Sequence, residues 1–318
     1  MSWDVLTLGE AMLRLSVPPG SRLVESARFD VHVAGAEVNT SIALAALGRE
    51  VTWLSRLPDN PLGRRVASEL ISNGVDTTHV QWVDGARLGV YYVELTGPPR
   101  SVSVVYDRAS SAAADMGPDD FDLRLLESAR VAHITGITPA LSDTTRELSV
   151  DFVRRSRESG CRLTVDINYR SKLWSTDLAR KTLLALAAGA HVVVLTREDA
   201  RDVFGLSGEP DRVAAEARAM FEAETTVLTL GDQGSICVSD AGTGLIEAFP
   251  ASIVDRLGAG DAFMAGVIEG VLTGDMERGI EVGTVLASLA LGTHGDHVVT
   301  TRDEVMAILG GRDRTVDR

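Results

Sequence analysis

The chain is short of cysteine and of positive charge. Only two of its 318 residues are cysteines, Cys161 and Cys237, and they lack the spacing of a metal-binding motif. We therefore expect isolated thiols in a reducing compartment and no disulfide framework. The 31 lysines and arginines face 45 aspartates and glutamates, which gives a formal net charge of −14. This charge disfavours nucleic acids and anionic membranes as partners, because the overall field repels them.

Long hydrophobic runs and two common nucleotide motifs are also missing. The most apolar run, residues 183–195, contains His191 and is too short to span a bilayer. The first four residues include no basic segment of the kind that begins a signal peptide. The motifs Gly-x-x-x-x-Gly-Lys-Ser/Thr and Gly-x-Gly-x-x-Gly do not occur, which argues against a P-loop protein and a dinucleotide-binding fold. We expect a soluble, cytoplasmic protein.

What the chain does have is an alternation of short apolar segments and helical patterns. The segments that we expect to form strands are residues 3–8, 51–54, 131–135, 162–166, 191–195 and 226–230. Helices are expected at residues 38–47 and 63–73, with Gly48 and Gly74 as their stops. Apolar strands of four to six residues indicate a sheet buried on both faces. The pattern predicts an α/β/α three-layer sandwich with a mostly parallel central sheet, formed by residues 1–318 as a single domain.

Two stretches, about 11–34 and 87–107, break this alternation. They contain strand-like segments at residues 12–17, 28–33, 89–95 and 101–106, with Gly97-Pro98-Pro99 as a hairpin signal. Their hydrophobic pattern has a period of two, so one face of these strands is apolar and needs a cover. We predict a small antiparallel β lid that covers the active site, the lid of a second copy, or both. A homodimer through the lid is therefore expected.

The most informative segment is Asp255-Arg256-Leu257-Gly258-Ala259-Gly260-Asp261. It indicates a glycine-rich turn that opens a helix, whose free backbone N–H groups lie at the positive end of the helix dipole. Such a turn can hold phosphate oxygens. Asp261 is placed to accept a proton from a hydroxyl that approaches the phosphate, although the same dipole is expected to lower its basicity. Taken alone, the segment could equally be an ordinary helix start.

Two further glycine turns have the same ambiguity. The first is Ala34-Gly35-Ala36-Glu37-Val38-Asn39, where Gly35 permits close approach of a ligand and Asn39 offers a donor and an acceptor. The second, Thr229-Leu230-Gly231-Asp232-Gln233-Gly234, follows a strand at the sheet edge where ligands of open α/β folds bind. Each could also be a routine turn.

Together and in this order, the motifs resemble those of the ribokinase-like (PfkB) carbohydrate kinases over essentially the whole chain. Within that family the likeness is greatest to the 2-keto-3-deoxygluconate kinases. The stretches that carry it are residues 8–16, 105–112, 135–141, 166–170 with Leu173-Trp174, and Asp255-Arg256-Leu257. The resemblance implies a ribokinase-like fold and transfer of the γ-phosphoryl group of ATP to a primary hydroxyl, which gives a 6-phosphate.

The resemblance also implies which residues contact the sugar acid. They are Gly35, Asn39, Tyr91, Tyr106, Arg108, Arg170 and Asp261. A carboxylate bound by a protein with net charge −14 needs fixed cations, and the guanidinium groups of Arg108 and Arg170 suit this role. The alternatives are a surface ion pair between Arg108 and Asp107, and a helix-cap contact for Arg170.

For ATP, the implied residues are Thr196, Thr229, Gly231, Gly234, Gly258, Gly260, Ala287 and Ser288. The backbone of Gly258, Ala259 and Gly260 would stabilise the transferring phosphoryl group. Mg²⁺ is implied as the ion on the ATP phosphates, with Asp199 as a ligand through water. The family usually has Asn where this chain has Thr196.

A monovalent cation near Asp255, as in some relatives, is possible. Two other functions stay open: phosphorylation of another sugar or sugar acid, such as fructose, ribose or a different deoxy sugar acid, and a non-catalytic sugar or nucleotide sensor.

Overall fold

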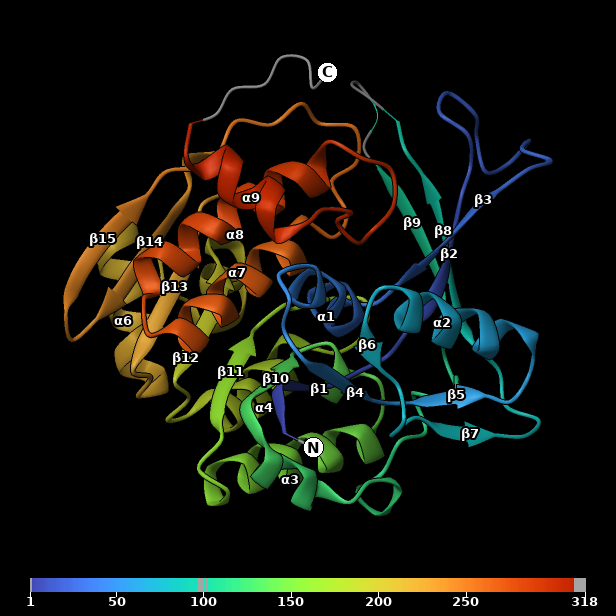
Figure 1. The fold of residues 1–318 in the computed structure, drawn as a ribbon, viewed down its shortest axis with the longest axis horizontal. Helices are drawn as coiled ribbons and strands as arrows, with labels where there is room; N and C mark the ends of the chain where they lie inside the picture. Colours follow the sequence, from blue (N-terminus) through green and yellow to red (C-terminus); the bar gives the residue numbers. More distant parts are fainter. Residues whose placement is uncertain (1, 97–99, 101, 312–318) are drawn as a thin grey trace.

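A nine-stranded sheet forms the centre of the protein. The computed structural model describes residues 2–96, 100 and 102–311, and the strands follow the order β15-β14-β13-β12-β11-β10-β1-β4-β6 (Figure 1). From β13 to β6 all neighbours are parallel, and β14 and β15 are antiparallel. The strands are β1 (Trp3–Leu8), β4 (Val51–Leu54), β6 (Val75–Asp76), β10 (Ala129–Thr135), β11 (Arg162–Asp166), β12 (Val192–Thr196), β13 (Thr225–Thr229), β14 (Ser235–Ser239) and β15 (Gly242–Ile246).

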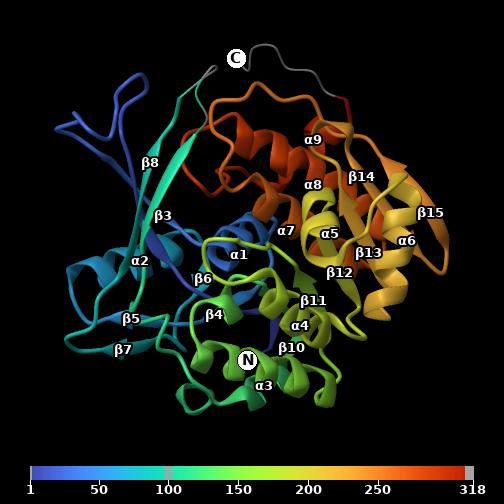
Figure 2. The ribbon, with the colours of Figure 1, turned by 180° about the vertical axis from the view of Figure 1, so that it is seen from behind.

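Helices cover both faces of this sheet (Figure 1, Figure 2). One layer packs against the sheet through one hydrophobic cluster and contains α3 (Asp143–Glu158), α4 (Thr176–Ala187), α5 (Arg197–Phe204) and α6 (Pro210–Phe221). The other layer contains α1 (Ala36–Ala46), α7 (Ala259–Thr273), α8 (Met276–Leu291) and α9 (Arg302–Leu309). Successive residues of a strand enter opposite clusters: Val193 belongs to the first and Val194 to the second. This confirms the three-layer sandwich that the apolar strands predict.

The lid is a four-stranded sheet beside the sandwich (Figure 1). Its strands, in the order β3-β2-β8-β9, are β2 (Met12–Ser16), β3 (Asp30–Ala34), β8 (Gly89–Glu94) and β9 (Ser103–Asp107). The outer pairs β2–β3 and β8–β9 are antiparallel, whereas the central pair β2–β8 is parallel. The predicted hairpin turn at Gly97-Pro98-Pro99 and the predicted first residue of the last strand, Ser101, lie outside the described residues.

A third core joins the lid to the sandwich. α2 (Pro61–Ser72) packs with α1 and the lid strands around the fully buried Trp53. Beside it lies a parallel pair, β5 (Arg56–Pro58) and β7 (Gln81–Val83), which the sequence patterns did not predict. In the described part of the chain, no helix is both long and apolar enough to cross a membrane.

Candidate active site

The tip of α7 forms the predicted glycine turn. Gly258 caps the helix with a φ of 81°, a left-handed conformation that glycine adopts without strain. A Cβ atom at this position would collide with the main-chain carbonyl of Asp296. A Cβ atom at Gly260 would meet nothing within 4 Å. The turn is therefore packed on one side and open on the other, and its first-turn N–H groups lie at the helix dipole's positive end.

Asp261 lies in the first turn of α7, where α1 holds it in place. Asn39 Nδ2 donates a hydrogen bond to Asp261 Oδ2 at 2.7 Å, and Thr40 Oγ1 donates to the Asp261 carbonyl at 3.0 Å. Burial raises the pKa of Asp261 well above its usual range, against the opposing effect of the Asn39 hydrogen bond. The net pKa of Asp261 therefore shifts opposite to the direction expected from the helix dipole alone, because loss of hydration raises it.

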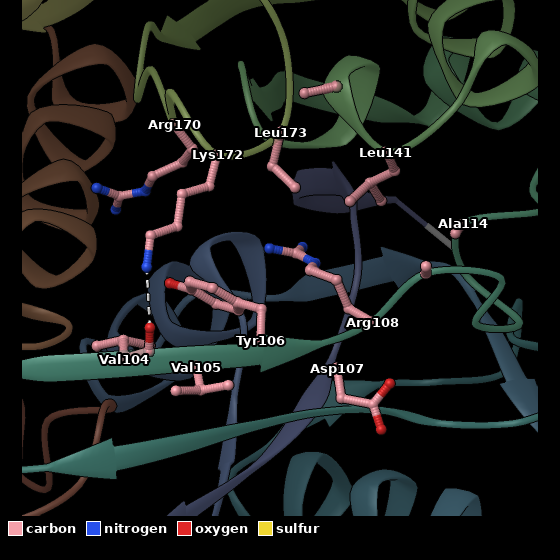
Figure 3. A pocket seen from close by; sticks show the side chains of 12 residues that line it. Val104, Val105, Tyr106, Asp107, Arg108, Ala114, Leu141, Arg170, Lys172 and Leu173 are labelled. Carbon is pink, nitrogen blue, oxygen red and sulfur yellow. Dashed lines mark hydrogen bonds between the residues drawn. The ribbon is translucent and has the colours of Figure 1, made fainter.

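Two adjoining cavities lie between the lid and the sandwich, and the smaller one includes Gly258 and Asp261 of this turn. The smaller encloses about 70 Å³, and all seven residues predicted to bind the sugar acid line it: Gly35, Asn39, Tyr91, Tyr106, Arg108, Arg170 and Asp261. Glu10, Glu37 and Asp296 line it as well, and the sequence analysis did not single them out. The larger cavity, about 550 Å³, lies against β9 and shares Tyr106, Arg108 and Arg170 with the smaller one (Figure 3).

The two arginines expected to bind a carboxylate differ in their surroundings. Arg108 is buried and forms an ion pair with buried Glu10, with Nε 2.8 Å from Oε2. The surface pair with Asp107 does not form, because Asp107 pairs with Arg87 instead. Arg170 is exposed, and none of the described carboxylates lies within ion-pair distance of it. Arg170 therefore has the more available charge.

A buried ionic network lies under the lid, and the sequence analysis missed it. The side chain of Arg14 is 1% exposed, and Nη1 lies 2.9 Å from Asp296 Oδ2 while Nη2 lies 2.5 Å from Asp255 Oδ2. Tyr91 donates its hydroxyl proton to Asp296 Oδ1 at 2.5 Å. Burial opposes the charge of Arg14, but Asp296 and Asp255 outweigh it and raise the pKa of Arg14. One signal was available: strand alternation places Arg14 on the same face as Met12 and Ser16.

The predicted ATP residues lie along the carboxyl ends of the strands. Thr196 and Thr229 end adjacent strands and are register partners. Gly231 begins the short 3₁₀ turn between β13 and β14 and Gly234 follows it, both with positive φ. Ala287 and Ser288 lie on α8, where Ser288 Oγ donates to the Pro250 carbonyl at 2.6 Å. Neither of the two cavities above includes these six residues, so their role stays a prediction.

Asp199, the predicted magnesium ligand, is part of a helix cap. Thr196 Oγ1 accepts the N–H of Asp199 at 2.9 Å, and Asp199 Oδ2 accepts the N–H of Thr196 at 3.3 Å. Thr196 thus fills the cap position. Burial, then the charge of Asp199, raises the pKa of neighbouring Asp166 to about 7. Burial also raises the pKa of Asp199.

Within the described residues, no group of three or more His, Cys, Asp or Glu side chains is arranged to hold a metal ion. Asp166 and Asp199 form no ion pair with a described residue, although the charge of Arg170 acts to lower the pKa of both. Their hard oxygen ligands fit Mg²⁺ held mainly through water and phosphate. They do not form a closed metal cage.

Known proteins resemble this chain over its full length. The pfkB family carbohydrate kinases match residues 3–302. A 2-dehydro-3-deoxygalactonokinase of Haloferax volcanii is 38% identical over 100% of both chains. A 2-dehydro-3-deoxygluconokinase of Thermoproteus tenax is 32% identical over 92% of this chain and 90% of its own.

A crystal structure of 2-dehydro-3-deoxygluconokinase from Thermotoga maritima superposes with a TM-score of 0.91 at 32% identity, covering 96% of this chain and 99% of that one. The fold and the family resemblance found in the sequence are therefore confirmed. The chain belongs to the pfkB family of carbohydrate kinases, which are phosphotransferases with an alcohol acceptor.

Proposed function

We propose that this protein is a cytoplasmic, ATP-dependent kinase that phosphorylates the primary hydroxyl of 2-keto-3-deoxygluconate and forms the 6-phosphate. One observation carries the proposal. Seven residues from five separate parts of the chain, predicted as a sugar-acid site, line one cavity at the tip of α7. Such convergence is not expected if each motif were an ordinary turn.

The turn and Asp261 divide the chemistry between them. The acceptor oxygen forms a bond to the γ-phosphorus, the bond from that phosphorus to the β–γ bridging oxygen breaks, and ADP leaves. Asp261 takes the hydroxyl proton, and Asn39 fixes the orientation of its carboxylate through the 2.7 Å hydrogen bond. The N–H groups of Gly258, Ala259 and Gly260 stabilise the negative charge of the transferring group. Because the transition state is loose, orientation by Asp261 matters more than its base strength.

The acid group of the substrate is assigned to Arg170, with Arg108 in support. Arg170 lacks an ion-pair partner among the described residues and reaches both cavities. Arg108 is already neutralised by Glu10 and is suited to hydrogen bonding and to positioning Tyr106, whose ring centroid lies 5.6 Å from its guanidinium. A bidentate guanidinium contact would distinguish a sugar acid from a neutral sugar.

Magnesium would be held near Asp199 and Asp166 with the ATP phosphates, and when bound it supplies charge neutralisation between the β- and γ-phosphates. The residues that we assign to ATP are Thr196, Thr229, Gly231, Gly234, Gly258, Gly260, Ala287 and Ser288. Support for this assignment comes from the alignment of Thr196 and Thr229 at the sheet edge, where ligands of open α/β folds bind.

A second substrate is favoured by one comparison. The Haloferax volcanii relative that is 38% identical is named for 2-dehydro-3-deoxygalactonate, an epimer of the gluconate compound. Both epimers carry the same carboxylate, keto group and primary hydroxyl. The proposed roles of Arg170 and Asp261 therefore apply to either, and only hydrogen bonds to the epimeric hydroxyl would discriminate between them.

Initial rates of ADP release test the proposal. We would compare both epimers with fructose and ribose at saturating ATP, and confirm the phosphorylated position by phosphorus–proton coupling in NMR. We expect kcat/KM for one or both sugar acids to exceed that for the neutral sugars by about 10²-fold or more. Preference for a neutral sugar contradicts the acid specificity. No ADP release with any acceptor favours the sensor function instead.

We also propose a homodimer through the outer face of the lid. Leu15, Val31, Tyr92 and Val105 are cross-strand neighbours and share that face, and Val105 is 51% exposed. An apolar sheet face of this kind is typically covered by a partner.

A further inference from the structure

Arg14 is an arginine held between two carboxylates from distant parts of the chain. It projects from lid strand β2, Asp255 precedes the glycine turn, and Asp296 follows α8. The side chains are 1%, 0% and 6% exposed. A buried ion pair is costly to desolvate and is weak support for stability by itself. Stability alone therefore does not explain why Arg14 is buried between these two carboxylates.

All four oxygens of these carboxylates already have protein donors. Asp255 Oδ2 accepts from Arg14 and Asp255 Oδ1 accepts the N–H of Leu257 at 3.1 Å. Asp296 Oδ2 accepts from Arg14 and Asp296 Oδ1 accepts from Tyr91. A monovalent cation bound by these carboxylates would have to share oxygens that already have donors. The Arg14 guanidinium already pairs with both carboxylates, so the residues present do not fit such an ion.

Both carboxylates also belong to the framework of the anion-binding turn. Asp255 lies three residues before Gly258, and its contact with the Leu257 N–H fixes the entry into the turn. The main-chain carbonyl of Asp296 fills the space where a Cβ atom of Gly258 would lie. Arg14 and Tyr91 reach these groups from adjacent lid strands, β2 and β8. Arg14 therefore connects the lid that faces the sugar to the turn that faces the phosphate.

We infer that Arg14 is a positioning residue that serves as the built-in cation of the Gly258–Asp261 turn and makes phosphoryl transfer independent of K⁺ and Na⁺. The inference rests on the proposed kinase function. Ser16 Oγ, which accepts from Arg14 Nε at 2.6 Å, fixes the plane of the guanidinium. Lysine cannot reproduce this fork of donors.

The first test needs no variant. The rate of ADP release by the wild-type protein is measured with its best acceptor in KCl, NaCl and tetramethylammonium chloride at equal ionic strength, with the fold monitored by circular dichroism. We expect rates within about two-fold of one another, because the fixed charge is already present. An increase of ten-fold or more with K⁺ or Na⁺, on an unchanged fold, overturns the inference.

The second test separates positioning from folding. In Arg14→Ala we expect kcat to fall by about 10²-fold, since small displacements of a reacting group have effects of this size. Added methylguanidinium or K⁺ should restore part of that rate, and Arg14→Lys should restore little. The matched control is Arg49→Ala, which removes another poorly exposed arginine, whose Nε and Nη2 lie 2.6 Å from Glu269 oxygens in the later part of α7.

Arg49→Ala should lower the thermal midpoint without changing kcat below that midpoint or responding to guanidinium. A normal kcat in folded Arg14→Ala contradicts the inference. If Arg14→Ala does not fold, the wild-type cation test and Arg14→Lys decide the question. An inactive wild-type protein, by contrast, refutes the proposed function and not the role of Arg14 alone.

Discussion

The two sides of the α7 tip differ in how their buried charges are balanced. On the lid side three buried acids are paired with arginines: Glu10 pairs with Arg108, and Asp255 and Asp296 share Arg14. On the sheet-edge side, Asp166, Asp199 and Asp261 form no ion pair with any described residue, and burial raises the pKa of each. The charges of these three lid-side acids therefore have positive partners within the folded chain.

The contrast indicates that positive charge is needed at the sheet-edge acids and not at the lid-side acids. An isolated buried carboxylate is costly unless it is protonated or receives a cation. In the proposed function, Arg14 and Arg108 compensate the three lid-side acids, whereas Mg²⁺ bound with ATP would compensate Asp166 and Asp199. Packing follows the same division: Gly258 is tightly enclosed on the Asp296 side and Gly260 faces open space.

Alanine substitutions at the two glycines of the turn should show the largest difference between the two sides, one in stability and the other in kcat. Gly258→Ala adds a strained backbone and a collision with the Asp296 carbonyl, so we expect a loss of at least ~3 kcal/mol in unfolding free energy. Gly260→Ala should fold normally but lower kcat by about 10²-fold, because its methyl group obstructs the phosphoryl group. Calorimetry and steady-state kinetics on both variants check this. Full activity of Gly260→Ala would show that the phosphate does not approach there.

Removal of Arg108 should mainly reduce stability, whereas removal of Arg170 should mainly reduce activity on the sugar acid. Arg108→Ala leaves buried Glu10 without a positive partner, with only the Ser111 hydroxyl as a donor among the described residues, and should cost ~3–5 kcal/mol of stability, part of which Glu10→Gln in the same chain restores. Arg170→Ala should leave stability within ~0.5 kcal/mol but reduce kcat/KM for the sugar acid by about 30-fold, or ~2 kcal/mol. Denaturant titrations and kinetics with fructose as a neutral comparison measure both. Equal loss for acid and neutral sugar would remove the carboxylate role of Arg170.

The uncompensated acids should make stability depend on pH. Burial raises the pKa of Asp166 from 3.8 to about 7, so between these values the folded protein keeps a proton that the unfolded chain releases. Unfolding free energy should therefore fall as pH rises from about 4 to 7, with a slope of up to ~1.4 kcal/mol per pH unit from this group. Urea titrations with EDTA and without nucleotide measure it. Asp166→Asn should flatten the profile, and exposed Asp303→Asn should not; an unchanged profile in Asp166→Asn contradicts the assignment.

The smallest expected effect concerns the outer lid face. Val105→Glu should shift the protein from dimer to monomer in sedimentation velocity with little change in the stability of the protomer. Val150, 48% exposed on α3, provides the matched control Val150→Glu. A wild-type protein that sediments as a monomer would contradict the proposed dimer.

Local patterns predicted much of the fold. Strands β1, β4 and β11 were placed at their observed bounds, since buried parallel strands have continuous apolar runs. The parallel pairing of β2 with β8 was not predicted, because it joins segments some 70 residues apart and no turn between them sets the register.

The site residues also divide into those predicted from local motifs and those that depend on long-range contacts. Gly35, Asn39 and Asp261 lie in motifs that can be read along the chain. Arg14 and Asp296 were missed, since their roles depend on contacts between residues 282 positions apart. The net direction of the Asp261 pKa was not predicted, because the burial that raises it depends on tertiary packing around the side chain and not on its helix position alone.

The rate of a single turnover in Asp261→Asn tests the central claim most directly. With saturating ATP, Mg²⁺ and sugar acid, rapid-quench measurement of ADP formation reports the transfer step alone. We expect a decrease of about 10²–10⁴-fold relative to the wild type, with substrate binding retained and Asp303→Asn unaffected. A transfer rate equal to that of the wild type would show that Asp261 is not the group that orients and deprotonates the acceptor.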